Sequence, residues 1–336
     1  MSSVKVGWQK GVVISTRQAK VVLDPIGGRG VGKNTHIFIT HAHADHTYGL
    51  RTGAKKYATA ETIKIYEKLN HEQLRNTVPI QMNKRIKIED ITITPVNAGH
   101  MLGSAQFLVE TPGKTVLYTG DINCIDTLTT KAAQAADCDE LIMEATYGDP
   151  FYVFPSRHRI YARIVEWAAA QARKGRSPIF RVYAAGKAQE IVRLFNVYTT
   201  LPVVANSSVS KVNEAHAIFG VKLDYVENSS RKESDVFDGI HVFVTTTRDE
   251  SITSEKSIRA MATGWALKMH SRNFPSFPLS SHADFRQLVS FVRATKAKKV
   301  YLYTGYVDIF SEYLMKKLEL KAKPLPPLAQ TELQDF

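Results

Sequence analysis

The stretch Thr40–Thr47 constrains this chain more than any other part of its sequence. Three histidines and one aspartate fall within six residues there, directly after the apolar run Ile37–Ile39, which predicts a β-strand. A loop at a strand end can direct such side chains at one point, and zinc accepts imidazole and carboxylate ligands. A polar turn with surface histidines is the alternative interpretation. The stretch predicts a metal-dependent enzyme whose ligands include His41, His43, Asp45 and His46.

Composition narrows the class of protein. The 336 residues can bury a large core in one or two domains, and a hydrophobic content of 44% is ordinary for a globular protein. The sequence has neither an apolar run long enough to span a membrane nor an N-terminal signal pattern, so we expect a cytoplasmic protein without a membrane partner. Cys124 and Cys138 lack the spacing of a disulfide framework or of a zinc site. Histidine and carboxylate side chains must therefore hold any metal.

The positive charge is concentrated in the middle of the chain. The net charge is +12, and residues 151–279 contribute +7 of it, with 18 Lys and Arg against 11 Asp and Glu. Such an excess favours a polyanionic partner such as nucleic acid, although many basic proteins bind none.

The expected secondary structure changes near residue 150. Residues 1–150 contain mostly short strands and look antiparallel, whereas residues 151–275 alternate strands with helices, which is typical of parallel βαβ units. Residues 276–320 return to site-like loops, a strand and helices, and residues 321–336 form a proline-rich tether. We therefore predict an α/β fold in which residues 151–275 are a module inserted into the first domain.

Further site-like residues follow other predicted strands. His100 lies in a glycine-flanked loop, Asp121 lies just beyond a strand, and Glu144 ends a strand beside a Gly/Pro loop. Asp24 ends a strand ahead of the histidine-rich stretch, where it could orient a ligand or simply begin a turn. His282 precedes a predicted helix, and a residue near the helix cap is its alternative interpretation. Together these residues supply ligand types that the first stretch still needs.

The order of these motifs along the chain resembles that of the metallo-β-lactamase fold in its β-CASP nuclease branch. Within that branch, three segments are most similar to the ligase-associated DNA exonucleases and their Artemis-like relatives: 144–148 (EATYG), 185–189 (AGKAQ) and 263–265 (TGW). The resemblance extends to about residue 320. It implies an αββα sandwich of two sheets, with an inserted β-CASP α/β domain over the metal cleft.

The resemblance also implies a role for each site residue. The ligands of a first zinc ion would be His41, His43 and His100, with Asp121 as a bridge to a second zinc ion held by Asp45 and His46. Two such metals would activate a shared water and clamp the scissile phosphate. His282 would then protonate the leaving group, and Glu144 would fix its tautomer and raise its pKa. The catalytic residues would thus be Asp45, Glu144 and His282.

One position departs from the family pattern. Thr304 stands where RNA-cleaving members have a histidine ligand for the second zinc and where DNA-acting relatives have valine. A threonine hydroxyl is a poor zinc ligand, so we expect the second metal to bind more weakly, with manganese as an alternative to zinc. The departure favours DNA over RNA.

Several residues outside the ligand set are expected to contact the substrate. Gly186 and Lys187 open a predicted helix, where free backbone N–H groups and a lysine favour phosphate; an ordinary helix start is the alternative. Ser280 and Ser281 could contact a terminal phosphate, and we expect Trp265 to bind substrate as well.

The last seven residues resemble the QxxLxxF peptide with which DNA repair enzymes bind sliding clamps. The matching residues are Gln330, Leu333 and Phe336, and their spacing would place Leu333 and Phe336 on one face of a helical turn. A frayed polar terminus is the alternative. We therefore expect a sliding clamp as a possible partner.

The sequence as a whole predicts a zinc-dependent nuclease that hydrolyses DNA phosphodiester bonds, as a 5′-end-directed exonuclease in repair. An RNA-processing β-CASP ribonuclease is the alternative, because Glu144 and the segment 185–190 also resemble RNA-acting members. A nucleic-acid-binding scaffold without activity is the alternative from another class, and it would bind nucleic acid without metal-dependent cleavage.

Overall fold

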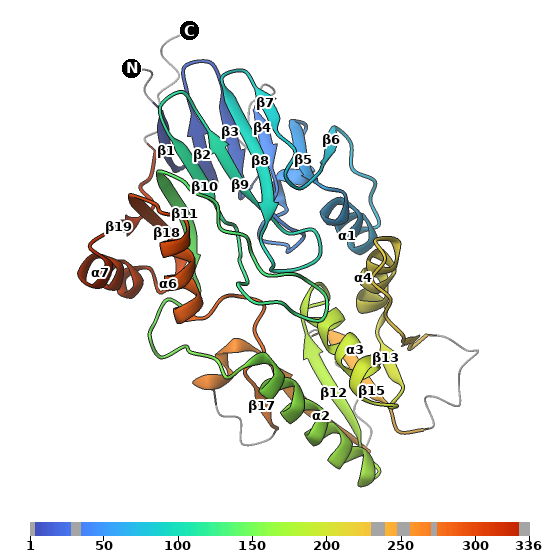
Figure 1. Ribbon diagram of the computed structural model, residues 1–336. Helices are drawn as coiled ribbons and strands as arrows, with labels where there is room; N and C mark the ends of the chain where they lie inside the picture. The colour runs from blue at the N-terminus through green and yellow to red at the C-terminus, as the bar shows by residue number, and fades with distance from the viewer. Residues whose placement is uncertain (1–3, 28–34, 230–238, 247–255, 270–273, 329–336) are drawn as a thin grey trace.

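The computed structural model describes residues 4–27, 35–229, 239–246, 256–269 and 274–328. Its upper part in Figure 1 contains two β-sheets packed face to face. The first sheet follows the order of the chain, with strands β1 (Lys5–Trp8), β2 (Val12–Ser15), β3 (Lys20–Leu23), β4 (His36–Phe38), β5 (Lys55–Thr59) and β6 (Thr77–Ile80).

Only two of the five strand pairings in this first sheet are antiparallel. Strands β1 to β3 are antiparallel, whereas β3 to β6 are parallel, which differs from the antiparallel opening that the sequence suggests. The reason is that the connections after β3 cross over instead of turning back. The link from β4 to β5 contains the histidine-rich stretch and the short helix η1 (Tyr48–Arg51), and the link from β5 to β6 contains α1 (Ala60–Asn70).

The second sheet has seven strands in the order β19-β18-β11-β10-β9-β8-β7. It is antiparallel from β7 to β10 and parallel from β10 to β19. The strands are β7 (Ile86–Ile88), β8 (Ile91–Asn97), β9 (Ala105–Glu110), β10 (Thr115–Tyr118), β11 (Glu140–Ala145), β18 (Lys299–Gly305) and β19 (Lys321–Pro324).

The main core lies between the two sheets. Phe38 and Leu23 from the first sheet and Phe107 and Val116 from the second are fully buried in one cluster. Helix α1 covers the outer face of the first sheet, while α6 (Phe285–Ala294) and α7 (Val307–Leu318) cover that of the second (Figure 1). The αββα sandwich predicted from the sequence is therefore confirmed.

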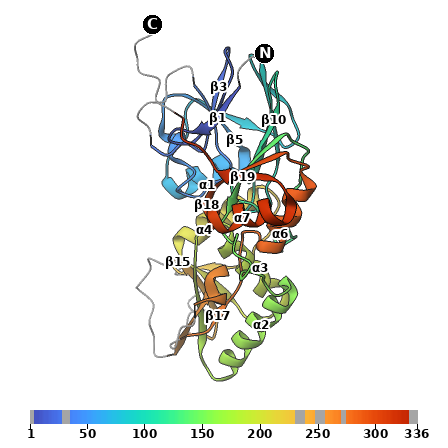
Figure 2. The same ribbon diagram turned by 90° about the vertical axis from the view of Figure 1, so that its left-hand side faces the viewer.

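A third sheet lies below this sandwich in both views (Figures 1 and 2). It is parallel, in the order β14-β13-β15-β12-β16-β17, and has its own core with its helices. Its elements, and the short helix that follows β16, are α2 (Arg157–Arg173), β12 (Ser177–Val182), α3 (Lys187–Tyr198), β13 (Val203–Ala205), α4 (Ser207–Ile218), β14 (Val226–Glu227), β15 (Val242–Thr246), β16 (Ser257–Ala262), η3 (Gly264–Leu267) and β17 (Ser276–Phe277). We call this part the second module. Its residues nearly coincide with the segment 151–275 that we predict to be inserted.

The end of the described chain is part of the sandwich. Strand β19 extends the second sheet, and beyond it the Leu328 N–H donates to the Trp8 carbonyl (2.9 Å) and the Trp8 N–H to the Pro326 carbonyl (2.8 Å). This differs from the tether predicted for residues 321–336, because backbone pairing with β18 and β1 anchors its first eight residues. The predicted clamp-binding residues Gln330, Leu333 and Phe336 lie outside the described residues. Among the helices that are described, none is long and apolar enough to cross a membrane.

Candidate metal centre and active site

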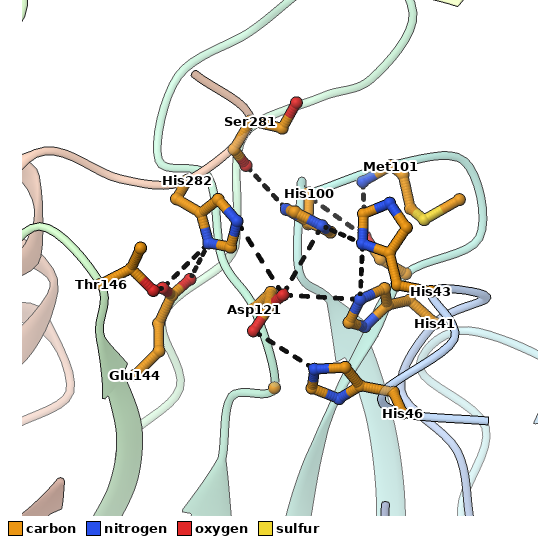
Figure 3. A network of polar contacts seen from close by, with 12 residues as sticks. His41, His43, His46, His100, Met101, Asp121, Glu144, Thr146, Ser281 and His282 are labelled. Carbon is orange, nitrogen blue, oxygen red and sulfur yellow. Dashed lines mark hydrogen bonds and ion pairs between the residues drawn. The ribbon is translucent and has the colours of Figure 1, made fainter. Parts of the chain in front are cut away.

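The predicted ligands converge between the sandwich and the second module (Figure 3). His41 to His46 follow β4, Asp121 follows β10, and His100 lies in the loop between β8 and β9. Strand ends from both sheets of the sandwich therefore meet at this point.

One set of four donor atoms matches a single tetrahedral metal ion. The Nδ1 atom of His43 lies 3.1 Å from the Nε2 atom of His41 and 3.1 Å from that of His100. The Oδ2 atom of Asp121 lies 3.5 Å from His41 Nε2 and 3.7 Å from His100 Nε2. Tetrahedral zinc with bonds of about 2.0–2.1 Å separates its ligand atoms by roughly 3.3–3.4 Å. The four residues therefore fit one zinc ion.

The outer ring nitrogens of these histidines are also held. Their partners are the Thr40 hydroxyl for His41 (2.9 Å), the Ser281 carbonyl for His100 (2.8 Å) and the Ala185 carbonyl for His43 (3.2 Å). Metal-binding histidines typically have such a partner, which fixes the tautomer and the ring orientation. Because Ala185 belongs to the second module, that module helps to orient a ligand of the sandwich.

A second donor set shares Asp121 with the first. The Nε2 atom of His46 lies 3.6 Å from Asp121 Oδ1 and 3.7 Å from Asp45 Oδ2. Thr304 lines the same cleft at the end of β18, where it offers only a hydroxyl. The second set therefore offers three residues of the types that bind zinc, and its donor atoms are less closely grouped than the four of the first set.

Asp24 is buried behind the second set and orients His46. Its carboxylate accepts hydrogen bonds from the Thr40 N–H (2.8 Å) and hydroxyl (2.6 Å), from the Tyr118 hydroxyl (3.0 Å) and from His46 Nδ1 (2.8 Å). Asp24 has a φ of 44°, a left-handed conformation that aspartate tolerates better than most residues. The structure thus places Asp24 behind His46, within hydrogen-bond distance of its Nδ1 atom. Nothing in the sequence singles out Tyr118, which reads as part of a buried strand.

Burial prepares the three histidines of the first donor set to bind a cation, whereas neighbouring charges favour the protonated form of His46 and burial favours that of Asp121. Burial lowers the pKa values of His41 and His100 well below the ordinary range and that of His43 to about 4, so these rings are neutral and can donate a lone pair. Burial also acts to lower the pKa of His46, but Asp121 and Asp24 outweigh it and raise this pKa to about 10. For Asp121 itself, burial raises the pKa to about 6.

His282 and Glu144 form a pair beside the first donor set. The Nδ1 atom of His282 lies 3.0 and 2.9 Å from the two carboxylate oxygens of Glu144, which also accept hydrogen bonds from the Ile122 N–H (2.7 Å) and the Thr146 hydroxyl. The Nε2 atom of His282 lies 4.0 Å from Asp121 Oδ2 (Figure 3). Burial acts to lower the pKa of His282, but Glu144 and Asp121 raise it above its ordinary value. The ring can therefore hold a proton that faces the metal centre.

A cleft of about 590 Å³ opens onto these residues and is lined by both parts of the chain. Of the expected substrate contacts, it exposes Lys187, Trp265 and Ser281. Burial lowers the pKa of Lys187 to about 8. These three side chains therefore line the same cleft as the donor sets.

Two expected substrate contacts are engaged within the protein. The Gly186 N–H donates to the Gln189 side chain (2.8 Å), so it is not free to bind a phosphate. The Ser280 hydroxyl accepts from the His282 N–H (2.9 Å) and donates to the His282 carbonyl (3.0 Å), so it shapes the loop that carries His282. Sequence reasoning missed both arrangements because each depends on a side chain turning back on its own loop.

Two contacts of the second module were also not anticipated. Arg157 of α2 donates from Nη1 to the Ser280 carbonyl (2.6 Å), which links this helix to the loop of His282. Tyr183, just beyond β12, lines the cleft near His43. An isolated arginine or tyrosine carries no recognisable sequence signal.

Residues 13–178 match a family model described as the beta-lactamase superfamily domain, and the matched part contains the whole first donor set. This chain contains a metallo-β-lactamase domain. The sequence-based recognition of this fold is thereby confirmed.

Curated relatives of this chain include proteins named for DNA and for RNA. It is 26% identical over 292 residues to a probable DNA ligase of Opitutus terrae, covering 83% of this chain and 28% of that protein. It is 33% identical over 185 residues to an RNase J-like protein of Methanocaldococcus jannaschii, covering 52% of this chain and 42% of that protein. It is 27% identical over 285 residues to the 5′ exonuclease Apollo of Gallus gallus, covering 80% of this chain and 58% of that protein. The chain thus spans less than two thirds of each of these relatives.

A solved structure has the same fold. It is the crystal structure of a protein of unknown function from Enterococcus faecalis V583, with a TM-score of 0.66 and 16% identity, covering 90% of this chain and 94% of that one. The likeness extends over both the sandwich and the second module.

Proposed function

We propose that this chain is a metal-dependent nuclease that hydrolyses DNA phosphodiester bonds, acting from the 5′ end of a strand. The observation that carries the proposal is the position of Asp121, which belongs to two adjacent donor sets and faces His282 Nε2 at 4.0 Å. Two metal sites joined by one carboxylate, with a proton donor beside them, are the parts that phosphodiester hydrolysis requires. Zinc suits the first set, and zinc or manganese the weaker second set.

Each residue has a definite task in this reaction. Metal ions bound here would supply Lewis acidity and an activated water. Lys187 holds a positive charge in the cleft, where it attracts the substrate backbone. Glu144 holds His282 with Nδ1 toward itself, so Nε2 presents its proton to the cleft. That proton passes to the leaving oxygen when the phosphorus–oxygen bond breaks.

Two observations support DNA as the substrate. The relative named as a probable DNA ligase aligns over 83% of this chain, whereas the RNase J-like protein aligns over 52%. Thr304 leaves the second donor set without a further imidazole, which the family resemblance associates with DNA-acting members. An RNA-processing ribonuclease is the second candidate, favoured by the higher identity to the RNase J-like protein.

The test compares matched strands of DNA and RNA. The purified chain is incubated with Zn²⁺ or Mn²⁺ and with strands carrying a 5′-phosphate or a 5′-hydroxyl, labelled at either end. We expect metal-dependent cleavage of DNA that begins at the 5′ end and disappears in His282→Ala. Preferential cleavage of RNA would replace the substrate assignment, and binding without cleavage under every condition would favour the inactive scaffold.

A further inference from the structure

The cleft has aromatic side chains beyond each end of the row of histidine rings. Tyr183 lies at the His43 end, with its ring centroid 5.9 Å from that of His43. Trp265 lies beyond the His282 end, packed against Tyr147 at 4.8 Å, and the Tyr147 ring lies 6.2 Å from His282. We propose that Tyr183 and Trp265 stack on unpaired nucleobases, so that the substrate must enter as a single strand. This inference rests on the proposed nuclease function and adds the strand form of the substrate.

The exposure of these two rings supports the inference. Tyr183 is 70% exposed and Trp265 is 38% exposed, although both line the cleft. Large aromatic side chains usually bury most of their surface, so exposed rings beside a site indicate a ligand that covers them. Trp265 is also held in place by Tyr147 and Tyr152, whose ring centroids lie 4.8 and 5.4 Å away. A ring held in this way loses little conformational freedom when a base stacks on it.

The segment that carries Tyr183 is held rigidly at the centre. The Ala185 carbonyl contacts His43, and the fully buried Gln189 side chain bonds both the Gly186 N–H (2.8 Å) and the Ala184 carbonyl (2.9 Å). Two residues after Ala185, Lys187 lines the same cleft. A basic side chain next to exposed aromatic rings is the usual pattern of single-strand binding, in which the cation attracts the backbone and the rings stack on bases.

The size of the cleft agrees with a single strand. A volume of about 590 Å³ is typical of a site for a drug-sized ligand, which corresponds to one or two nucleotides. The cleft can therefore take the end of one strand.

A binding cycle tests the stacking of Tyr183. The background is His282→Ala, which keeps DNA intact, and the probes are fluorescent single strands with one abasic nucleotide at successive positions from the 5′ end. We expect Tyr183→Ala to weaken binding of the complete strand about 5- to 100-fold, and Tyr183→Phe to leave it unchanged. On the strand whose abasic nucleotide replaces the base that Tyr183 contacts, Tyr183→Ala should cause no further loss of affinity, because that base is already missing. Trp265→Ala should show the same behaviour at another position.

Tyr198→Ala is the matched control, because Tyr198 is also exposed but lies outside the cleft lining. It should not change binding. If Tyr183→Ala lost the same binding affinity on every abasic strand, or lost none, stacking would be overturned. The proposed nuclease function would still hold in that case, provided that the unmodified chain cleaved DNA. A chain that neither bound nor cleaved any nucleic acid would instead remove the proposed function itself.

Discussion

Replacing Glu144 with glutamine isolates the charge that supports the proton donor. In the native chain one carboxylate oxygen of Glu144 accepts a hydrogen bond from the Ile122 N–H. The two carboxylate oxygens lie at nearly equal distances from His282 Nδ1, 3.0 and 2.9 Å. The glutamine carbonyl can occupy the position of the first oxygen and accept hydrogen bonds from the Ile122 N–H and from His282 Nδ1. The glutamine amide group can then donate to the Thr146 hydroxyl. The substitution therefore removes the negative charge and leaves a hydrogen-bonded arrangement available.

The expected loss follows from this change. A hydrogen bond to a charged group contributes about 1.5–3 kcal/mol and a neutral one about 0.5–1.5 kcal/mol, so loss of the charge alone costs about 1–1.5 kcal/mol, and Glu144→Gln should lower kcat roughly 5- to 15-fold at neutral pH. Complete removal of the donor in His282→Ala should cost about 10²- to 10⁴-fold. Thr146→Val, which deletes one hydrogen bond but leaves the charge, should cost less than either.

The same substitution has a predictable pH dependence. Burial acts to lower the pKa of His282, and Glu144, together with Asp121, raises it, so the donor stays protonated to higher pH than an ordinary histidine. Activity that depends on this proton is present below the raised pKa and falls as the pH rises through it. Without the Glu144 charge, the pKa of His282 should be lower, because burial still lowers it and only Asp121 still raises it. The fall in activity should therefore move to lower pH.

The assay is single-turnover cleavage of a 5′-labelled DNA strand across a pH series, with metal content and DNA affinity measured in parallel. Metal content and affinity should be unchanged in Glu144→Gln, because Glu144 belongs to neither donor set for which we propose a metal. An unchanged kcat with an unshifted alkaline limb would refute the role given to the His282–Glu144 pair. Loss of metal from the variant would show that Glu144 supports the centre instead.

Four further predictions follow from the site and the chain end. Asp45→Ala should release about one metal per chain and leave the first site filled, which elemental analysis can measure; loss of both metals would contradict two separate donor sets. Thr304→His should lower the Kd of the second metal in a titration, and an unchanged Kd would mean that this position does not face the metal. Burial lowers the pKa of Lys187 to about 8, so its charged form is lost above that pH and DNA affinity should fall from about pH 7 to about pH 9. Lys187→Arg should remove this fall, because arginine stays charged over this range. An identical fall in the arginine variant would exclude Lys187 as its cause. Deleting residues 330–336 should abolish binding to a sliding clamp in a pull-down, and a full-length chain that binds no clamp would refute the partner assignment.

The sequence by itself determined the chemistry of the centre, because its main ligands occur as local patterns. The histidine-rich stretch places four donors in six residues after a strand, and the backbone of such a loop brings them together whatever else the chain does. His100, Asp121 and Glu144 could be added because each lies at or beyond the end of a strand that is visible in the pattern of apolar residues. The αββα sandwich followed from the resemblance of these ordered motifs to the β-CASP nuclease branch of the metallo-β-lactamase fold.

Only the tertiary structure decided how the centre is supported and what lines the cleft. The bond from His43 to the Ala185 carbonyl joins residues 142 positions apart, and it depends on how the second module packs on the sandwich. The same packing brings Tyr183 to the cleft and Arg157 to the loop of His282. The pairing of β19 with β18 likewise depends on a sheet edge that the sequence does not display. Such contacts leave no periodic or local signal, because the side chain or backbone group on each side is ordinary and only its distant partner gives it a role.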